Sequence, residues 1–69
     1  MIIITFVNGQ KLEIFDIVNF EEVLVNFIRW ADSTERNDNV FIFTKSSEGK
    51  TITVLKNNIL YFETFKDKN

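Results

Sequence analysis

The fold depends most on residues 40–65, which read VFIFTKSSEGKTITVLKNNILYFETF. This stretch holds three runs rich in β-branched and aromatic residues, separated by turn-forming residues. The runs are Val40–Lys45, Lys50–Leu55 and Ile59–Phe65. The pattern predicts three consecutive antiparallel strands, joined by a turn at residues 46–49 and a tight turn at Asn57-Asn58.

The simplest turns also fix the register of this meander, with Lys45 facing Lys50 and Lys56 facing Ile59. One face then carries Phe41, Phe43, Ile52, Val54, Ile59 and Tyr61. The other carries Val40, Ile42, Thr44, Thr51, Thr53, Leu55, Leu60 and Phe62. Both faces are apolar, although an antiparallel sheet with one face in water normally alternates apolar and polar residues.

A second hairpin is predicted at the N-terminus, because Asn8-Gly9 separates two further strand-like runs. With a two-residue loop, Val7 faces Gln10. One face then carries Ile3, Thr5, Val7, Leu12 and Ile14. A one-residue bulge at Gly9 would exchange the faces of one strand relative to the other, and both registers stay open at this point.

Between the two strand regions, residues 20–31 have the apolar spacing of a helix. The apolar stripe consists of Phe20, Val23, Leu24, Phe27, Ile28 and Ala31, with Trp30 on its flank. Asn19 is the expected N-cap, and Glu22 is expected to complete a capping box. Residues 32–39 are polar and predict a surface loop.

These elements predict an α+β fold in the order ββ-α-βββ, with about five mainly antiparallel strands packed on one helix. Residues 1–66 are expected to form a single small domain, and residues 67–69 a frayed tail. The opening hairpin, the helix and the next strand resemble the start of a β-grasp fold in element order. The C-terminal residues 66–69 lack the Gly-Gly of conjugated or sulfur-carrying members, so the resemblance implies a fold and no such chemistry.

Composition excludes several kinds of function in this chain of 69 residues. There is no cysteine and no histidine, so disulfides, thiolate metal sites and a serine–histidine triad are excluded. The net charge of −2 is too balanced for a basic nucleic-acid surface. No apolar run approaches the roughly 20 residues of a membrane span, and no signal peptide is evident. A soluble cytoplasmic protein is expected, and the residue usage suggests a bacterial or phage source.

Other candidate sites each have a simpler structural explanation. Asp16, Glu21 and Glu22 near the helix start suit the helix dipole better than an acid–base pair. Single glycines at positions 9 and 49 fit turns and not a phosphate-binding loop. The loop acids Asp32, Glu35 and Asp38 lack calcium-loop spacing. No catalytic residue, cofactor or metal is therefore predicted.

The unexplained feature is the second apolar face of the C-terminal strands, because a helix of about twelve residues spans only ~18 Å. The sheet could curl on itself, the N-terminal hairpin could cover the face as a sandwich, or the face could meet a partner protein or a second copy. The sequence favours a non-enzymatic, accessory or regulatory interaction module that self-associates. The predicted contact residues are Trp30, Val40, Ile42, Leu60 and Phe62.

The alternative function is binding of single-stranded nucleic acid, which would stack its bases on strand aromatics beside lysines. The residues concerned are Phe41, Phe43, Tyr61 and Phe62, with Lys45, Lys50 and Lys56 at the strand ends. A place in the protein core is the competing interpretation for Phe41 and Phe43.

Overall fold

The computed structural model describes residues 1–34, 38–47 and 49–65, so the predicted tail at 67–69 lies outside the described residues. Within this part, the elements are β1 (Ile2–Phe6), β2 (Lys11–Ile14), α1 (Phe20–Asp32), β3 (Val40–Thr44), β4 (Thr51–Leu55), the 3₁₀ turn η1 (Lys56–Asn58) and β5 (Ile59–Thr64). Every strand pair is antiparallel. The expected α+β class and the ββ-α-βββ order are confirmed.

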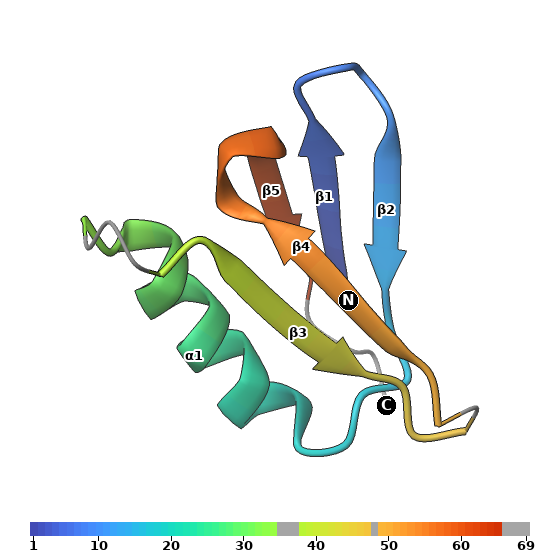
Figure 1. Ribbon diagram of the computed structural model, residues 1–69. Helices are drawn as coiled ribbons and strands as arrows, with labels where there is room; N and C mark the ends of the chain where they lie inside the picture. The colour runs from blue at the N-terminus through green and yellow to red at the C-terminus, as the bar shows by residue number, and fades with distance from the viewer. Residues whose placement is uncertain (35–37, 48, 66–69) are drawn as a thin grey trace.

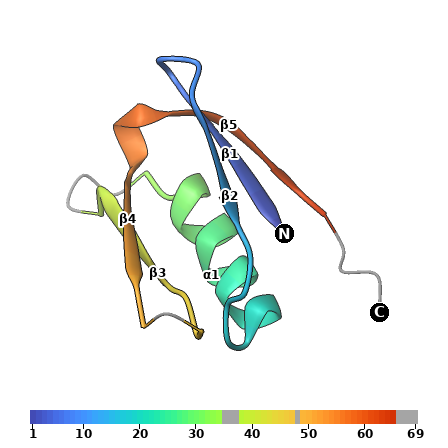
Figure 2. The ribbon, with the colours of Figure 1, turned by 90° about the vertical axis from the view of Figure 1, so that its right-hand side faces the viewer.

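The strands form two sheets, a three-stranded sheet in the order β2-β1-β5 and the separate hairpin β3-β4. Figure 2 shows the two sheets as facing layers, and Figure 1 shows α1 beside β3, along one side of the space between these layers. The β-grasp resemblance therefore extends to element order only, since β3 does not join the sheet of β1 and β2.

The N-terminal hairpin adopts the bulged register. The N–H of Phe6 donates to the carbonyl of Gln10 at 2.8 Å, and the N–H of Gly9 donates to the carbonyl of Phe6 at 2.9 Å. Gly9 has φ 89°, which only glycine adopts at little cost. Ile2 therefore pairs with Ile14, and Ile4 with Leu12. The two-residue-loop register was wrong because the extra loop residue exchanges the faces of β1.

The C-terminal strands follow the predicted register only as far as β4. The N–H of Lys45 donates to the carbonyl of Lys50 at 2.8 Å, as expected. The predicted meander fails afterwards, because η1 redirects the chain and β5 pairs with β1 instead of β4. Two isolated hairpins would each be marginal, whereas the crossing of β5 gives one of them a third strand.

A bulge in β5 adapts it to this position. Thr5 pairs with Tyr61 and Phe6 pairs with Ile59, which leaves Leu60 without a direct partner. The bulge allows both Ile59 and Phe62 to pack against the core, although their spacing in the sequence does not fit simple alternation.

The core collects side chains from both sheets and the helix. Its buried members are Ile2, Ile4, Ile14, Phe27, Trp30, Phe43 and Val54. Helix α1 is turned relative to the predicted stripe, because Trp30 is 4% exposed whereas Ile28 is 44% exposed. The expected side-chain cap is also absent: Asn19 is left-handed, with φ 56°, and makes no side-chain cap hydrogen bond.

Candidate protein-binding surface

The β3–β4 hairpin presents an apolar face to solvent, which we call the outer hairpin face. It consists of Val40, Ile42, Thr44, Thr51, Thr53 and Leu55, all exposed. Val40, Ile42 and Leu55 are 47%, 57% and 48% exposed. Val40 lies directly opposite Leu55, and neither β3 nor β4 contains a charged residue. The face thus combines apolar side chains with a lack of charge that is unusual for a solvated strand pair.

The opposite face of the same hairpin belongs to the core. Phe43 and Val54 are 1% and 2% exposed, and Phe41 and Ile52 are partly buried. The ring of Phe27 lies 5.3 Å from those of both Phe41 and Phe43. The hairpin therefore uses one apolar face for packing and leaves the other free.

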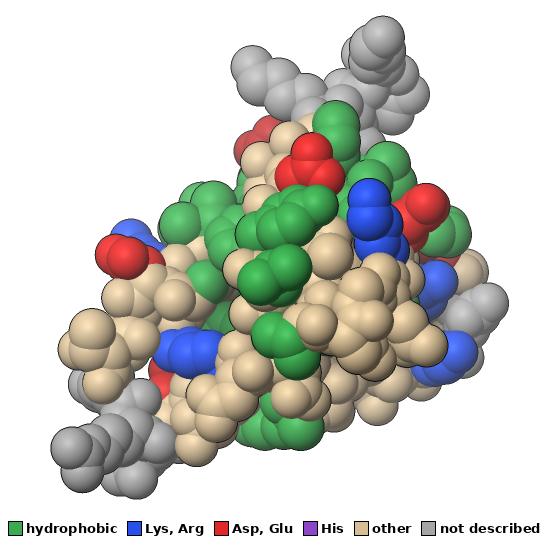
Figure 3. All heavy atoms as spheres, turned by 90° about the horizontal axis from the view of Figure 1, so that it is seen from above, with side chains coloured by type: hydrophobic (Ala, Val, Ile, Leu, Met, Phe, Trp, Pro, Cys, Tyr) green, Lys and Arg blue, Asp and Glu red, His purple; other side chains and the backbone are tan. Residues whose placement is uncertain are grey.

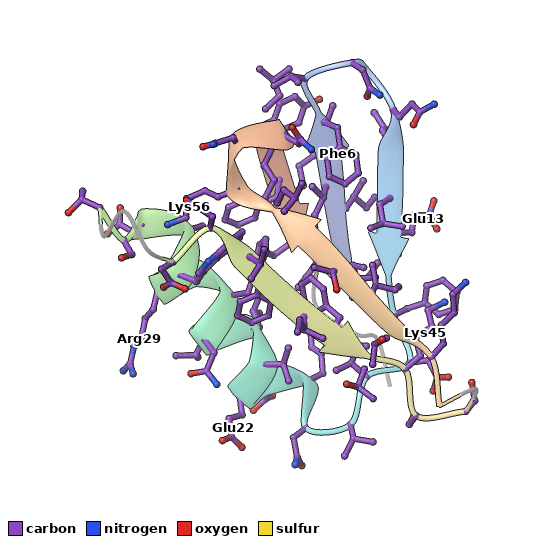
Figure 4. The ribbon with its side chains drawn as sticks, in the orientation of Figure 1. Phe6, Glu13, Glu22, Arg29, Lys45 and Lys56 are labelled. Atoms are coloured by element: carbon purple, nitrogen blue, oxygen red, sulfur yellow. The ribbon has the colours of Figure 1, made fainter. Side chains whose placement is uncertain are left out.

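A groove runs between α1 and β3, and we call it the β3 groove. It is lined by Asn26, Arg29, Trp30, Ser33, Asp38, Val40, Phe41 and Ile42. The indole Nε1 of Trp30 donates to the carbonyl of Asp38 at 2.9 Å, which fixes the groove wall. Figure 4 shows Arg29 and Glu22 extending from α1 away from the sheets. The groove thus has apolar side chains at β3 and, on α1, the polar Asn26 and Arg29 beside the Trp30 ring.

The five predicted contact residues do not form one patch. Val40 and Ile42 share the outer hairpin face, whereas Leu60, 61% exposed, lies at the bulge of β5 in the other sheet. Trp30 is in the core, and Phe62 packs on Phe27 with ring centroids 4.8 Å apart. The prediction overlooked Leu55, although its pairing with Val40 follows from the hairpin register.

The aromatic residues considered for base stacking are mostly occupied by packing. Phe41, Phe43 and Phe62 all contact Phe27. Tyr61, 46% exposed, is the one member of that predicted set classed as exposed.

Two of the three lysines in that set also have contacts within the chain. The Nζ of Lys45 lies 4.3 Å from the ring centroid of Phe15. The Nζ of Lys56 donates to the carbonyl of Ser33 at 3.0 Å and lies 5.0 Å from the Trp30 ring. Lys56 therefore places a positive charge at the C-terminal end of α1, as Figure 4 shows, where the helix dipole favours it.

Asp16 ties the linker after β2 to the turn after β3. Its carboxylate accepts hydrogen bonds from the hydroxyls of Ser47 and Ser46, the latter at 3.0 Å, and from the N–H of Ser47 at 3.3 Å. These bonds, with that from the Ser47 hydroxyl the largest contribution, lower the pKa of Asp16 below its ordinary value of 3.8. The cluster thus joins two segments of the chain, and both serines are used in this contact.

The remaining chemical groups give no sign of a metal or membrane site in the described part of the chain. No group of three acidic, histidine or cysteine side chains is close enough there to hold a metal, and Glu35 of the predicted loop acids lies outside this part. No helix among the described residues is long and apolar enough to cross a membrane.

Further hydrophobic side chains lie outside the hairpin. Exposed examples are Val7, Phe15, Val18, Val25, Ile28, Leu60, Tyr61 and Phe65. Seen from above, hydrophobic side chains form a band across the surface (Figure 3). The surface is therefore not uniformly polar, and the second apolar strand face is not sealed within one copy of the chain.

Comparison of this chain with protein-family models, with curated protein sequences and with solved structures finds no match.

Proposed function

We propose that the protein is a non-enzymatic, accessory or regulatory interaction module that binds protein through the outer hairpin face. The observation that carries this proposal is the exposure of Val40, Ile42 and Leu55 side by side on two strands that contain no charge. A hairpin that stayed in water would gain solubility from charged residues at these positions. Apolar side chains gathered on an exposed sheet face are typical of a binding surface.

The strength of self-association can be bounded from the same residues. Complete burial of one aliphatic side chain contributes about 1.5–3 kcal/mol, and these three are already about half buried. Association costs about 4–15 kcal/mol in lost freedom of motion. Two copies joined through this face alone would therefore form a weak, concentration-dependent dimer. A tighter complex needs contacts beyond the three side chains.

The test is sedimentation velocity over a wide range of protein concentration, with Ile42→Lys as the disruptive variant. Val25→Lys is the matched control, because Val25 is an exposed aliphatic residue of α1 that lies outside the hairpin. We expect the wild type and the control to sediment faster as concentration rises, and Ile42→Lys to remain monomeric. A wild type that is monomeric at every concentration would rule out self-association. Equal loss in both variants would rule out the outer hairpin face.

A further inference from the structure

The hydrogen bonds at the ends of the hairpin show which backbone groups of β3 point away from β4. The N–H of Lys45 donates to the carbonyl of Lys50, and the N–H of Lys56 donates to the carbonyl of Asn39, both at 2.8 Å. In an antiparallel pair, hydrogen-bonded and non-hydrogen-bonded residues alternate. The alternation from these two ends makes Phe41 and Phe43 the residues bonded to β4. The N–H and C=O groups of Val40 and Ile42 therefore point to the free edge of β3.

Part of this edge already holds an extended segment of the same chain. Ile17 forms an antiparallel bridge with Lys45, and the N–H of Ser46 donates to the carbonyl of Asp16 at 3.0 Å. The chain then turns away at Asn19, with its positive φ, and begins α1. Beyond this bridge, no other strand of the described chain pairs with β3 on the side away from β4. An extended segment of the chain thus occupies this edge at its Lys45 end only.

The free edge of β3 also lacks the features that normally prevent strand addition. Charged residues, proline and bulges protect exposed strand edges. Strand β2 carries Lys11 and Glu13, and β5 carries a bulge at Leu60 together with Glu63. Strand β3 has the sequence VFIFT and an uninterrupted register, so it has none of these protections.

The β3 groove gives the free edge of β3 a second wall. Asn26 and Trp30 of α1 line the side opposite β3, Arg29 lies at the rim, and Asp38, two residues before β3, also lines the groove. Within the described residues, Arg29 has no ion pair. A strand placed in this groove would direct alternate side chains toward α1 and toward the outer hairpin face.

We propose that the free edge of β3 binds an extended segment of a partner protein, which adds to the hairpin as a third, antiparallel strand. The segment continues the line of the Ile17 bridge and makes about four backbone hydrogen bonds with Val40 and Ile42. Its side chains alternate between aliphatic residues beside Val40 and Ile42 and acidic residues that reach Arg29. This inference rests on the proposed function, and the backbone bonds supply the contact that the outer hairpin face lacks.

The experiment uses the full chain and a capped six-residue peptide that alternates valine and glutamate. Titration is followed by amide chemical shifts and hydrogen exchange in NMR. We expect the peptide to slow exchange of the Val40 and Ile42 amides, which are free, and to leave Phe41 and Phe43 unchanged. The same peptide with lysine in place of glutamate is expected to bind more weakly, because it opposes Arg29.

Three variants separate backbone binding from side-chain binding. Ile42→Pro removes an outward N–H of β3, and Glu13→Pro removes an outward N–H on the free edge of β2, which lies in the other sheet. Proline is tolerated where the N–H faces solvent at an edge, so both variants should fold, which dispersed amide spectra verify. We expect Ile42→Pro to weaken peptide binding at least about tenfold. Glu13→Pro should bind like the wild type, and Ile42→Thr should lose much less than Ile42→Pro.

Each other outcome contradicts the edge proposal in a recognisable way. Equal losses in Ile42→Thr and Ile42→Pro would mean that the side chain carries binding, which overturns the edge and leaves the proposed function standing. Protection of Val40 and Ile42 without peptide that disappears on dilution would mean that a second copy fills the edge. No shift at the β3 amides, or shifts at the β4 edge, would also overturn it. Failure of the outer hairpin face as the binding surface is recognised separately, in sedimentation, when Ile42→Lys and Val25→Lys lose self-association equally.

Discussion

The two β layers of this protein present different surfaces to solvent. The β2-β1-β5 sheet carries Lys11, Glu13 and Glu63 on its strands, and hydrogen bonds between Met1 and Phe65 extend its pairing beyond β1 and β5. The β3–β4 hairpin has no charge in either strand and an incompletely covered edge. Both layers bury one apolar face against the same core. They therefore differ in their outer surfaces. This difference is the reason that our proposal places the partner on the hairpin.

The largest change in the free energy of unfolding should come from Phe27, whose ring contacts both layers. Phe27 is fully buried, and its ring contacts Phe41 and Phe43 of the hairpin and Phe62 of the other sheet. Phe27→Ala should lower the free energy of unfolding by about 3–5 kcal/mol, measured by urea denaturation. A domain of this size has a total stability on the order of 3–10 kcal/mol, so both layers should unfold together.

The control for this prediction is Val25→Ala, because Val25 is on the same helix and 48% exposed. Its effect on the free energy of unfolding should stay within about 0.5 kcal/mol. If Phe27→Ala melted only one layer, seen as loss of amide protection in that layer alone, the shared core would not couple them.

A smaller change in the free energy of unfolding, opposite in sign to that of Phe27→Ala, should distinguish the two layers. Thr5, on the central strand of the three-stranded sheet, is 5% exposed, and its Oγ1 has no hydrogen-bond partner. Thr5→Val should raise the free energy of unfolding by about 1 kcal/mol, because a buried hydroxyl without a partner is costly. Thr53→Val, at an exposed hairpin position, should change it little. Equal urea midpoint shifts in the two variants would remove this difference between the layers.

The smallest change in stability is expected at Asp16. This residue is exposed and holds the hairpin turn through hydrogen bonds from Ser46 and Ser47. Because its folded-state pKa is lowered, the stabilisation is present above the unfolded pKa and is lost as pH falls through the folded pKa. Asp16→Asn keeps the shape and tolerates the left-handed backbone. It should lower the thermal midpoint slightly at neutral pH, and this difference should vanish in acid.

Thermal midpoints of Glu22→Gln provide the comparison for Asp16→Asn, since Glu22 is also exposed and the change removes one negative charge. A difference from the wild type that persists for Asp16→Asn at the lowest pH would show that the carboxylate charge is not what holds the turn.

The types and order of the elements were predictable because they depend on local patterns. The helix spacing of residues 20–31 and the alternation in residues 40–55 each allow one arrangement, and the β3–β4 register follows from one turn. Only part of the exposed surface was predictable, namely the part that depends on local alternation. Val40 and Ile42 were identified from alternation. Trp30 was placed on the flank of the apolar stripe, at the core edge or in a partner contact, and the choice depends on how the helix packs.

The sequence by itself determined the helix and the five strands of the described residues, and it predicted more apolar strand surface than that helix can cover. Only the tertiary structure decided that β5 leaves β4 for β1 and that Trp30 turns inward while Ile28 turns outward. The reason is that local alternation sets which residues share a face of one strand, whereas strand partners are chosen by the total apolar surface that the whole chain can bury. Here the pairing of β5 with β1 brings Ile59 and Phe62 against the common core.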